Sequence, residues 1–193
     1  MTNKRTSTRA LVECALMIAA GTVLSQIKIF TMPYGGSVTL VSMLPFVIVS
    51  YRHGVKWGIF TGFVNSFLQM LTSFYLPPAG TFGAVAAMIL LDYILAFVCL
   101  GLAVVFARPF KNRKVGVGVG TAAVCLVRFL CSFLSGAMLW GSYQSYYEWA
   151  VGLSVWEYSF IYNASYMMPE LLITTVAAVA IASVAPKFFE VQK

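Results

Sequence analysis

Three ionisable residues lie deep inside long apolar stretches of the sequence: Asp92, Arg128 and Glu170. If these stretches cross a membrane, an ionisable side chain near the bilayer centre costs on the order of 3 kcal/mol, so each one needs a partner, a watery cavity or a function. Asp92 and Arg128 have opposite sign and comparable depth in neighbouring stretches, so a buried ion pair explains them without any ligand. Glu170 can compete for the same arginine. The alternative is that Asp92 faces a bound ligand.

Aromatic and amide side chains gather near the ends of the last two apolar stretches. They are Trp140, Tyr143, Tyr146, Tyr147, Trp149, Trp156, Tyr158, Tyr162, Asn163 and Tyr166. A carboxylate below a ring of aromatic faces suits a flat organic cation, because the acid compensates the charge while the rings supply stacking and cation–π attraction. An aromatic belt at a membrane interface explains several of these residues without a ligand, but explains Asn163 and Asp92 less easily. The residues therefore favour an organic cation with a polar edge and name no molecule.

Several enzyme chemistries lack the residues they need. Metalloproteases and catalytic triads use histidine as ligand or base, and the single histidine, His53, stands in a loop beside Arg52. The sequence holds no GxxxxGK[ST] loop to wrap phosphates, so a partner hydrolyses ATP if ATP is used. The four cysteines lie inside apolar stretches without CxxC spacing and are expected to be packing residues. We expect no enzyme, no cofactor and no metal site.

The composition indicates that lipid is the solvent of this chain. Of its 193 residues, 60% are hydrophobic and 10% are charged, and the mean hydropathy is +0.85. A spanning helix needs roughly 20 mostly apolar residues, so we expect an all-α polytopic membrane protein of six transmembrane helices, forming one transmembrane substrate-binding domain over residues 1–193. The apolar stretches fall at about 10–30, 37–51, 55–75, 82–107, 116–140 and 158–184.

The positive charges predict the orientation of these helices. Eleven of the 13 basic residues map to the two termini and to the connections near 52–56 and 108–114. By the positive-inside rule these parts face the cytoplasm, and the connections near 31–36, 74–81 and 141–157 face out. The formal net charge of +7 is then mostly a topological bias, reinforced by attraction to anionic membrane lipid. We expect no nucleic-acid partner.

Four segments resemble, in order and with consistent spacing, the thiamine-specific S component of energy coupling factor transporters. They are residues 32–40, 91–97, 128–136 and 158–170. The resemblance implies an S-component-like bundle of six helices in the bacterial cell membrane, with both termini cytoplasmic. It also implies that the chain captures thiamine, or a thiamine precursor or analogue, from outside and delivers it inward with a separate transmembrane coupling protein and two ATPase subunits.

The resemblance implies ligand contacts at matched positions. Asp92 takes the place of the acidic residue that faces the ligand, with Tyr93 beside it, while Trp140 and Tyr158 supply aromatic faces and Asn163 contacts the pyrimidine or its neighbour.

Three further ligand residues are implied at other places around the pocket. Arg128 is a basic group at the pocket floor that can also reach a phosphorylated form of the ligand. Tyr34 stands in the first outer loop, which is expected to close over the ligand as a lid. Ser132 is a departure, because the family typically has a histidine there, and this change bears on which related vitamin the pocket accepts.

The first helix of this family presents small residues, four apart, to the coupling protein. Here Ala15 and Ala19 fit that spacing, and Val23 stands where a third alanine is possible. Small residues at this spacing are also common in ordinary helix packing, so the assignment depends on the resemblance.

Two other functions remain possible from the sequence. A stand-alone secondary transporter or channel for a small organic cation often has two inverted halves, and no repeat is visible between the first three and the last three stretches. A structural membrane subunit would use Asp92 and Arg128 only as an ion pair. Replacing Asp92 distinguishes these functions, because only ligand capture predicts folded protein with weakened binding.

Overall fold

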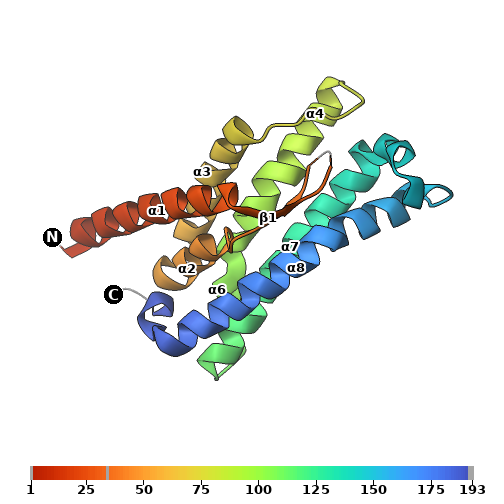
Figure 1. Ribbon diagram of the computed structural model, residues 1–193. Helices are drawn as coiled ribbons and strands as arrows, with labels where there is room; N and C mark the ends of the chain where they lie inside the picture. Colours follow the sequence, from red (N-terminus) through yellow and green to blue (C-terminus); the bar gives the residue numbers. More distant parts are fainter. Residues whose placement is uncertain (1, 34, 191–193) are drawn as a thin grey trace.

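Long helices lie side by side in an elongated bundle, crossed on one face by a short hairpin (Figure 1). The computed structural model describes residues 2–33 and 35–190, with the side chains of residues 2–7 left out of the description. The chain begins with α1 (Thr2–Gln26), which is followed by the strands β1 (Lys28–Thr31) and β2 (Ser37–Thr39). Two adjoining helices follow, α2 (Leu44–His53) and α3 (Val55–Thr72).

The second half of the chain contains the longest helical segments. Residues 82–107 form one helical segment of changing geometry, described below, and are followed by α7 (Arg113–Leu139) and α8 (Val155–Val184). Between α7 and α8 lie two short 3₁₀ turns, η3 (Gly141–Tyr146) and η4 (Glu148–Ala150), and η5 (Pro186–Phe189) follows α8. In Figure 1, α7 and α8 lie side by side along most of their length.

The expectation of a polytopic helical bundle is confirmed, with differences in individual segments. Within the described residues, four helical segments are long and apolar enough to span a bilayer: Thr8–Gln26, Phe82–Ala107, Arg113–Leu139 and Val155–Val184. The remaining two of the six expected segments are α2 and α3. With ten residues and a rise of roughly 1.5 Å per residue, α2 is too short to cross the hydrocarbon core alone.

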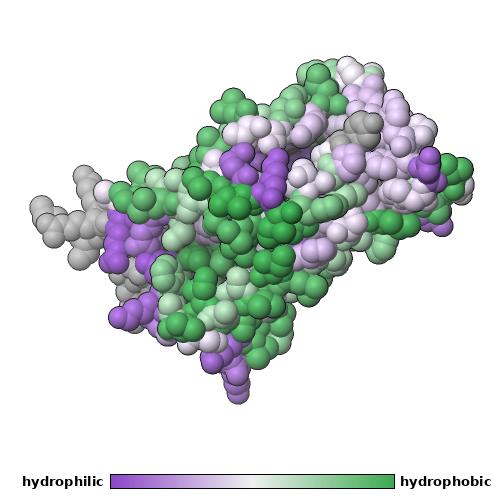
Figure 2. All heavy atoms as spheres, in the orientation of Figure 1, coloured by the Kyte–Doolittle hydropathy of each residue, from purple (hydrophilic) through white to green (hydrophobic). Residues whose placement is uncertain are grey.

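The start of α1 and the turn η5 lie at the same end of the bundle (Figure 1). Figure 2 shows hydrophilic side chains gathered at this end and at the turn between α6 and α7. The surface beyond them is largely apolar near these parts, with a further hydrophilic patch near the middle of the view and a mildly hydrophilic region at the far end. This arrangement is the one expected if both termini face the cytoplasm.

The hairpin corrects the predicted boundaries of the first two spans. We expected helix through residue 30 and again from residue 37, but the chain leaves the helix at Gln26 and pairs β1 with β2 in antiparallel register. The turn contains Gly35 and Gly36, both with positive φ (109° and 83°), a backbone conformation that glycine adopts without strain. Ile29 and Phe30, for which the apolar run predicts helix, have side chains that favour a strand equally well.

The segment from residue 82 to 107 is helical throughout but not uniformly α-helical. It consists of α4 (Phe82–Met88), the π-helix η1 (Ile89–Leu95), α5 (Ala96–Val98), the 3₁₀ turn η2 (Cys99–Leu102) and α6 (Ala103–Ala107). π-Helical turns occur often at functional sites, and Asp92 lies in this one.

The half of the bundle nearer the termini is filled by a closely packed core. Phe46 and Val47 of α2, Leu100 of η2 and Val124 of α7 are at most 1% exposed. Gly58 of α3 makes this packing possible together with Gly101, because a Cβ on either glycine would overlap backbone of the other's helix.

We predict that Gly101→Ala destabilises the protein by about 1–3 kcal/mol, since an extra methyl forces apart two helices that already touch. The thermal unfolding temperature of the purified protein in detergent measures the effect. Gly83→Ala in α4 is the matched control, because a Cβ there meets open space among the described residues. Equal unfolding temperatures for the two variants would contradict the packing assigned to Gly101.

Candidate functional site

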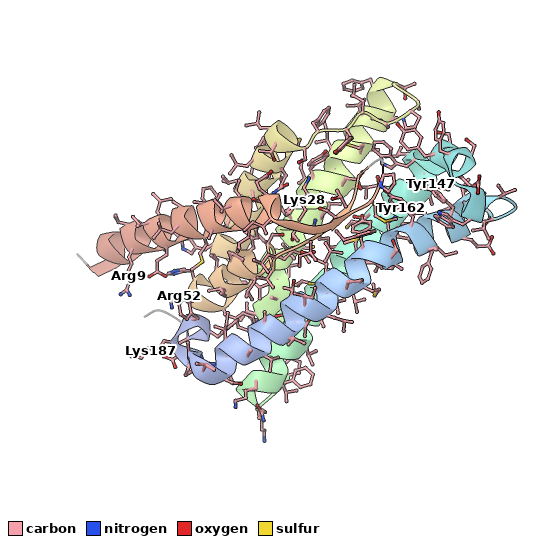
Figure 3. All side chains as sticks on the ribbon, viewed as in Figure 1. Arg9, Lys28, Arg52, Tyr147, Tyr162 and Lys187 are labelled. Carbon is pink, nitrogen blue, oxygen red and sulfur yellow. The ribbon has the colours of Figure 1, made fainter. Side chains whose placement is uncertain are left out.

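A cavity of about 260 Å³ lies between the hairpin, the end of α3, the π-helix η1, and the facing sides of α7 and α8. Figure 3 labels Lys28 at the base of the hairpin and places Tyr147 and Tyr162 near its turn. Carboxylate, guanidinium, amide and phenol groups all line the cavity. Such a mixture of aromatic walls with a few convergent polar groups is typical of a small-molecule site.

Asp92 is held in one orientation by two donors from α7 and its end. Its Oδ2 accepts a hydrogen bond of 2.6 Å from the Ser135 hydroxyl and one of 3.2 Å from the Trp140 indole nitrogen. Within the described part of the chain, Oδ1 accepts no hydrogen bond. Because a carboxylate has about four acceptor positions, Asp92 keeps acceptor capacity for a donor in the cavity it lines.

The ion pair considered for Asp92 and Arg128 does not form. No nitrogen of Arg128 lies within 4.0 Å of a carboxylate oxygen in the described residues, and its guanidinium instead lies 4.4 Å from the ring centroid of Phe97. The buried Nε of Arg128 has no hydrogen-bond partner there. Arg128 therefore enters the cavity lining as a cation stacked on an aromatic face.

Glu170 does not pair with Arg128 either, and instead holds the hairpin to α8. Its Oε2 accepts from the backbone N–H of Thr39 at 2.5 Å, and its Oε1 accepts from the Thr39 hydroxyl at 2.6 Å. Thr39 closes β2, and Glu170 is only 6% exposed. Both oxygens of this carboxylate are thus used in fixing the wall of the cavity.

Asn163 has a side-chain amide that local hydrogen bonds orient. Its Nδ2 donates to the backbone oxygen of Ser159 at 2.9 Å and lies 3.2 Å from the Ser159 hydroxyl, while its Oδ1 accepts from the Tyr166 phenol at 2.8 Å. The Nδ2 group donates within α8, and Oδ1 retains one acceptor position. Asn163 therefore presents an acceptor to the cavity it lines.

Tyrosines four residues apart on α8 form an aromatic wall. The ring centroids of Tyr158 and Tyr162 lie 5.8 Å apart, and those of Tyr162 and Tyr166 lie 6.0 Å apart. Trp149 stacks on Tyr158 at 5.7 Å with an interplanar angle of 29°. Residues at this spacing share one helix face, so α8 turns a continuous row of rings toward the hairpin and the cavity.

The turn of the hairpin rests on this wall. The Tyr147 phenol donates to the Pro33 carbonyl at 2.9 Å, and the Tyr162 phenol lies 2.5 Å from the same oxygen and also contacts the Gly35 carbonyl. Gly36 leaves no room for a side chain, since a Cβ there would overlap the ring of Tyr166. The hairpin is thereby attached to α8 near its turn and, through Glu170, at the end of β2.

Seven of the eight residues predicted as ligand contacts line this one cavity. They are Asp92, Tyr93, Arg128, Ser132, Trp140, Tyr158 and Asn163. Their contact with a ligand stays a prediction. The eighth, Tyr34, lies outside the described residues.

Tyr93 and Ser132 have different surroundings within the lining. The Tyr93 phenol donates to the Ser73 carbonyl at 2.6 Å and its ring stacks with Phe74 at 5.9 Å. Tyr93 is 8% exposed, so its main observed role is to join η1 to the end of α3. Ser132 lies beside the Tyr166 phenol on the facing side of the cavity.

Ser135 was missed from the sequence although it makes the shortest hydrogen bond to Asp92. A signal was present, because Arg128, Ser132 and Ser135 stand at positions i, i+4 and i+7 of one helix and therefore share a face. Thr39 and Lys28 were missed as well, since the hairpin that brings them to the cavity was not expected.

Ala15 and Ala19 lie on the outward face of α1, and both are exposed. Leu11 (51% exposed) and Val23 (63%) continue the same line at four-residue spacing. The predicted partner-binding positions are therefore accessible, while the partner contact itself stays a prediction.

The fold and the cavity define a small polytopic membrane protein with a pocket lined by polar and aromatic side chains. The chain matches the family model described as "Thiamine transporter protein (Thia_YuaJ)" over residues 11–190. It belongs to this family. Members of the family are transport proteins, so the chain is a multi-pass cell membrane protein of the transporter type and not an enzyme, as the sequence predicted.

Individual relatives agree with this assignment. The chain is 31% identical over 194 residues to "Thiamine transporter ThiT" of Bacillus subtilis (strain 168), covering 95% of each chain. It is 25% identical over 166 residues to "Thiamine transporter ThiT" of Lacticaseibacillus paracasei, covering 76% of this chain and 74% of the relative. A solved structure of ThiT from Listeria monocytogenes superimposes with a TM-score of 0.76 at 21% identity, covering 97% of this chain and all of that one (100%), and it shows the same fold.

We predict that Glu170→Gln loosens the hairpin. An amide nitrogen cannot accept from the Thr39 N–H or hydroxyl, so one buried donor loses its acceptor, at a cost of about 1–3 kcal/mol. Hydrogen–deuterium exchange should become faster in residues 37–42 of the variant. Glu148→Gln in the 3₁₀ turn η4 is the control, and equal exchange in the two variants would contradict the anchoring role of Glu170.

Proposed function

We propose that this chain is the substrate-capture subunit of an ATP-driven vitamin uptake transporter and binds thiamine, or a thiamine precursor or analogue, from the outside. The observation that carries this proposal is the arrangement of Asp92, whose Oδ2 is held by Ser135 and Trp140 while Oδ1 keeps free acceptor capacity beside an aromatic wall. Membership of the thiamine transporter family supports the same substrate.

The chemistry of thiamine matches the groups around the cavity. Thiamine carries a positively charged thiazolium ring and an aminopyrimidine whose amino group donates hydrogen bonds. In this proposal Asp92 accepts from the ligand and compensates its charge, and Asn163 accepts from the pyrimidine edge or its neighbour. Trp140 and Tyr158 stack on the rings, because cationic heterocycles are attracted to aromatic faces.

The remaining predicted ligand residues belong to the same proposal. Tyr93 supports the wall beside Asp92, and Ser132 meets the ligand where the family typically has a histidine. Arg128 stacks on Phe97, and in this proposal it meets a hydroxyl or phosphorylated end of the ligand. Tyr34 is assigned to the covering loop from the resemblance alone.

Delivery in this proposal depends on a separate transmembrane coupling protein and two ATPase subunits. The outward line of α1 that contains Ala15 and Ala19 is the docking face, because small residues allow another helix to approach closely. The described residues contain no phosphate-binding loop, so ATP hydrolysis belongs to the partners.

A stand-alone secondary transporter or channel for a small organic cation is the alternative function. The packed core on the cytoplasmic side of the cavity, which includes Phe46, Val47 and Leu100 at 0–1% exposure, favours capture from one side over a continuous path. Uptake of labelled thiamine by cells that express this chain with and without the coupling protein and ATPases separates the two. Uptake without those partners would favour the stand-alone transporter.

Isothermal titration of the purified protein with thiamine tests the substrate. Tight binding is expected, with a dissociation constant far below millimolar. Binding no tighter than about 1 mM, which corresponds to roughly 4 kcal/mol, would contradict capture of thiamine.

We predict that Asp92→Asn weakens thiamine binding by about 100-fold, since losing one charge of a buried, hydrogen-bonded charge pair costs about 3 kcal/mol. Titration calorimetry gives the affinity, and the unfolding temperature shows whether the variant is folded. Glu148→Gln, which removes a carboxylate outside the cavity, should bind like the unchanged protein. Loss of folded Asp92→Asn protein would instead favour the structural role.

We predict that Trp140→Phe weakens thiamine binding by about tenfold, because the variant keeps an aromatic face but loses the N–H that orients Asp92. Trp156→Phe is the matched control, since Trp156 is 49% exposed and packs against Phe133 away from the cavity lining. Equal affinity of both variants would show that the indole N–H does not set the orientation of Asp92.

A further inference from the structure

The inward face of α1 carries mostly small side chains. Among residues 8–26 of this helix, the buried residues are Ala10, Cys14, Gly21 and Ser25, each at most 9% exposed. Small side chains allow close approach of helices, and the ring of Phe46 in α2 fills the space beside Gly21. Met17 and Ile18 add partly buried contacts with the core. Polar contacts add to this packing in setting the rotation of α1 about its axis.

Polar contacts hold α1 at two levels, near its middle and at its outer end. At the outer end, Gln69 of α3 donates to the Ser25 hydroxyl at 3.2 Å. Near the middle of the helix, Glu13 contacts Arg9, Arg52 and His53. A helix held by polar contacts at these two levels cannot rotate without breaking them.

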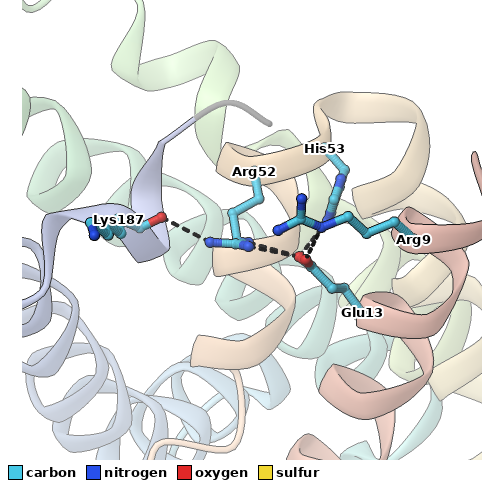
Figure 4. Close-up of polar contacts among 5 residues, drawn as sticks. All are labelled: Arg9, Glu13, Arg52, His53 and Lys187. Atoms are coloured by element: carbon cyan, nitrogen blue, oxygen red, sulfur yellow. Dashed lines mark hydrogen bonds and ion pairs between the residues drawn. The ribbon is translucent and has the colours of Figure 1, made fainter. Parts of the chain in front are cut away.

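Glu13 is the centre of an ionic cluster that joins three parts of the chain (Figure 4). Its oxygens lie 3.2 Å from Arg9 Nε of the same helix, and 2.9 Å from Arg52 and 2.8 Å from His53 Nε2 of α2. Arg52 also donates to the Lys187 carbonyl of η5 at 2.8 Å. The cluster thus connects α1 to α2 and to the turn after α8.

Apart from Arg9, which is 63% exposed, the side chains of this cluster are largely shielded from solvent. The exposed fractions are 19% for Glu13, 13% for Arg52 and 6% for His53. Charge-assisted hydrogen bonds in such surroundings are stronger than those of exposed ion pairs. Glu13 is also the only acidic residue in the sequence before Asp92, so no nearby carboxylate on α1 or α2 can replace it.

The position of Glu13 determines which face of α1 points outward. At 3.6 residues per turn, a residue two positions further along the helix is rotated by roughly 200°. Glu13, held against α2, therefore places Ala15 on the opposite side, together with Ala19. Both alanines are exposed, as this geometry requires.

We propose that Glu13 is a positioning residue that fixes the rotation of α1 and thereby holds the line of Leu11, Ala15, Ala19 and Val23 outward for the coupling protein. This inference rests on the proposed function for its partner. It assigns to the cytoplasmic cluster a role in transport that is separate from ligand binding, because the cluster lies at the opposite end of the bundle from the cavity.

The first experiment needs neither ligand nor partner. Hydrogen–deuterium exchange in lipid nanodiscs is compared for the unchanged protein, Glu13→Gln and Glu190→Gln. Glu190 also pairs with an arginine at the cytoplasmic end, Arg113, at 3.1 Å, but not with α1. Glu13→Gln is expected to speed exchange in residues 8–26, and Glu190→Gln is not. Unchanged exchange in Glu13→Gln would overturn the proposal.

The second experiment separates coupling from capture. Thiamine affinity of the isolated chain is measured by calorimetry, and thiamine uptake is measured in cells that also express the coupling protein and ATPases, at matched membrane abundance. Glu13→Gln is expected to keep the affinity within about twofold and to lower the maximal uptake rate about tenfold. Glu13→Asp keeps a carboxylate on a shorter side chain, so its uptake rate should lie between those of the unchanged protein and Glu13→Gln. It replaces Glu13→Gln if that variant does not fold.

Three results would overturn the proposal. The first is an uptake rate of Glu13→Gln equal to that of the unchanged protein. The second is a fall in uptake rate in Glu190→Gln as large as that in Glu13→Gln. The third is a loss of thiamine affinity in Glu13→Gln as large as its loss of uptake rate. Failure of the unchanged protein to bind thiamine would instead refute the proposed function, and the exchange experiment would still test whether Glu13 fixes α1.

Discussion

The carboxylate of Asp92 is the constraint on which the site depends. A charged group inside a helical membrane bundle is tolerated only when its hydrogen-bonding capacity is used or when it faces a cavity. Here Ser135 and Trp140 satisfy Oδ2, and the rest of the carboxylate faces the pocket. Two elements therefore act together to fix a negative charge beneath aromatic rings. They are the π-helical turn that contains Asp92 and the end of α7 that supplies both donors.

The rest of the bundle divides into a part that shapes the cavity and a part that closes the other side. The hairpin supplies one wall, attached to α8 through Glu170 and the Tyr162 phenol and to the segment before α8 through the Tyr147 phenol. The core between α2, η2 and α7 fills the bundle toward the termini. Under the proposed function, the packed core below the pocket allows the ligand to enter from one side only. Delivery of the ligand to the other side then requires the whole bundle to move against a partner. The outward face of α1 is important because it is the proposed docking face for that partner.

Much of the fold could be predicted because long apolar runs have few alternatives in a bilayer. Seven of the eight residues that the resemblance implies as ligand contacts line one cavity. Strands over 28–31 and 37–39 were not predicted. Their β-branched and aromatic residues continue the neighbouring apolar runs, so no periodicity distinguishes a strand there from the end of a helix. The pairing of charges was also not predictable, because sign and depth favoured Asp92 with Arg128, whereas nearby neutral donors satisfied Asp92. Ser135 shows the same limit: a serine on the right helix face is common, and only three-dimensional structure shows that it reaches the carboxylate.

An experimentally determined structure of the protein with thiamine bound tests the central claim most directly. The account predicts that Oδ1 of Asp92 accepts a hydrogen bond from the ligand while Oδ2 keeps its bonds to Ser135 and Trp140, with the ligand rings against Trp140 and Tyr158. Thiamine bound elsewhere, or Asp92 turned away from the cavity and paired with Arg128 in the complex, would contradict it.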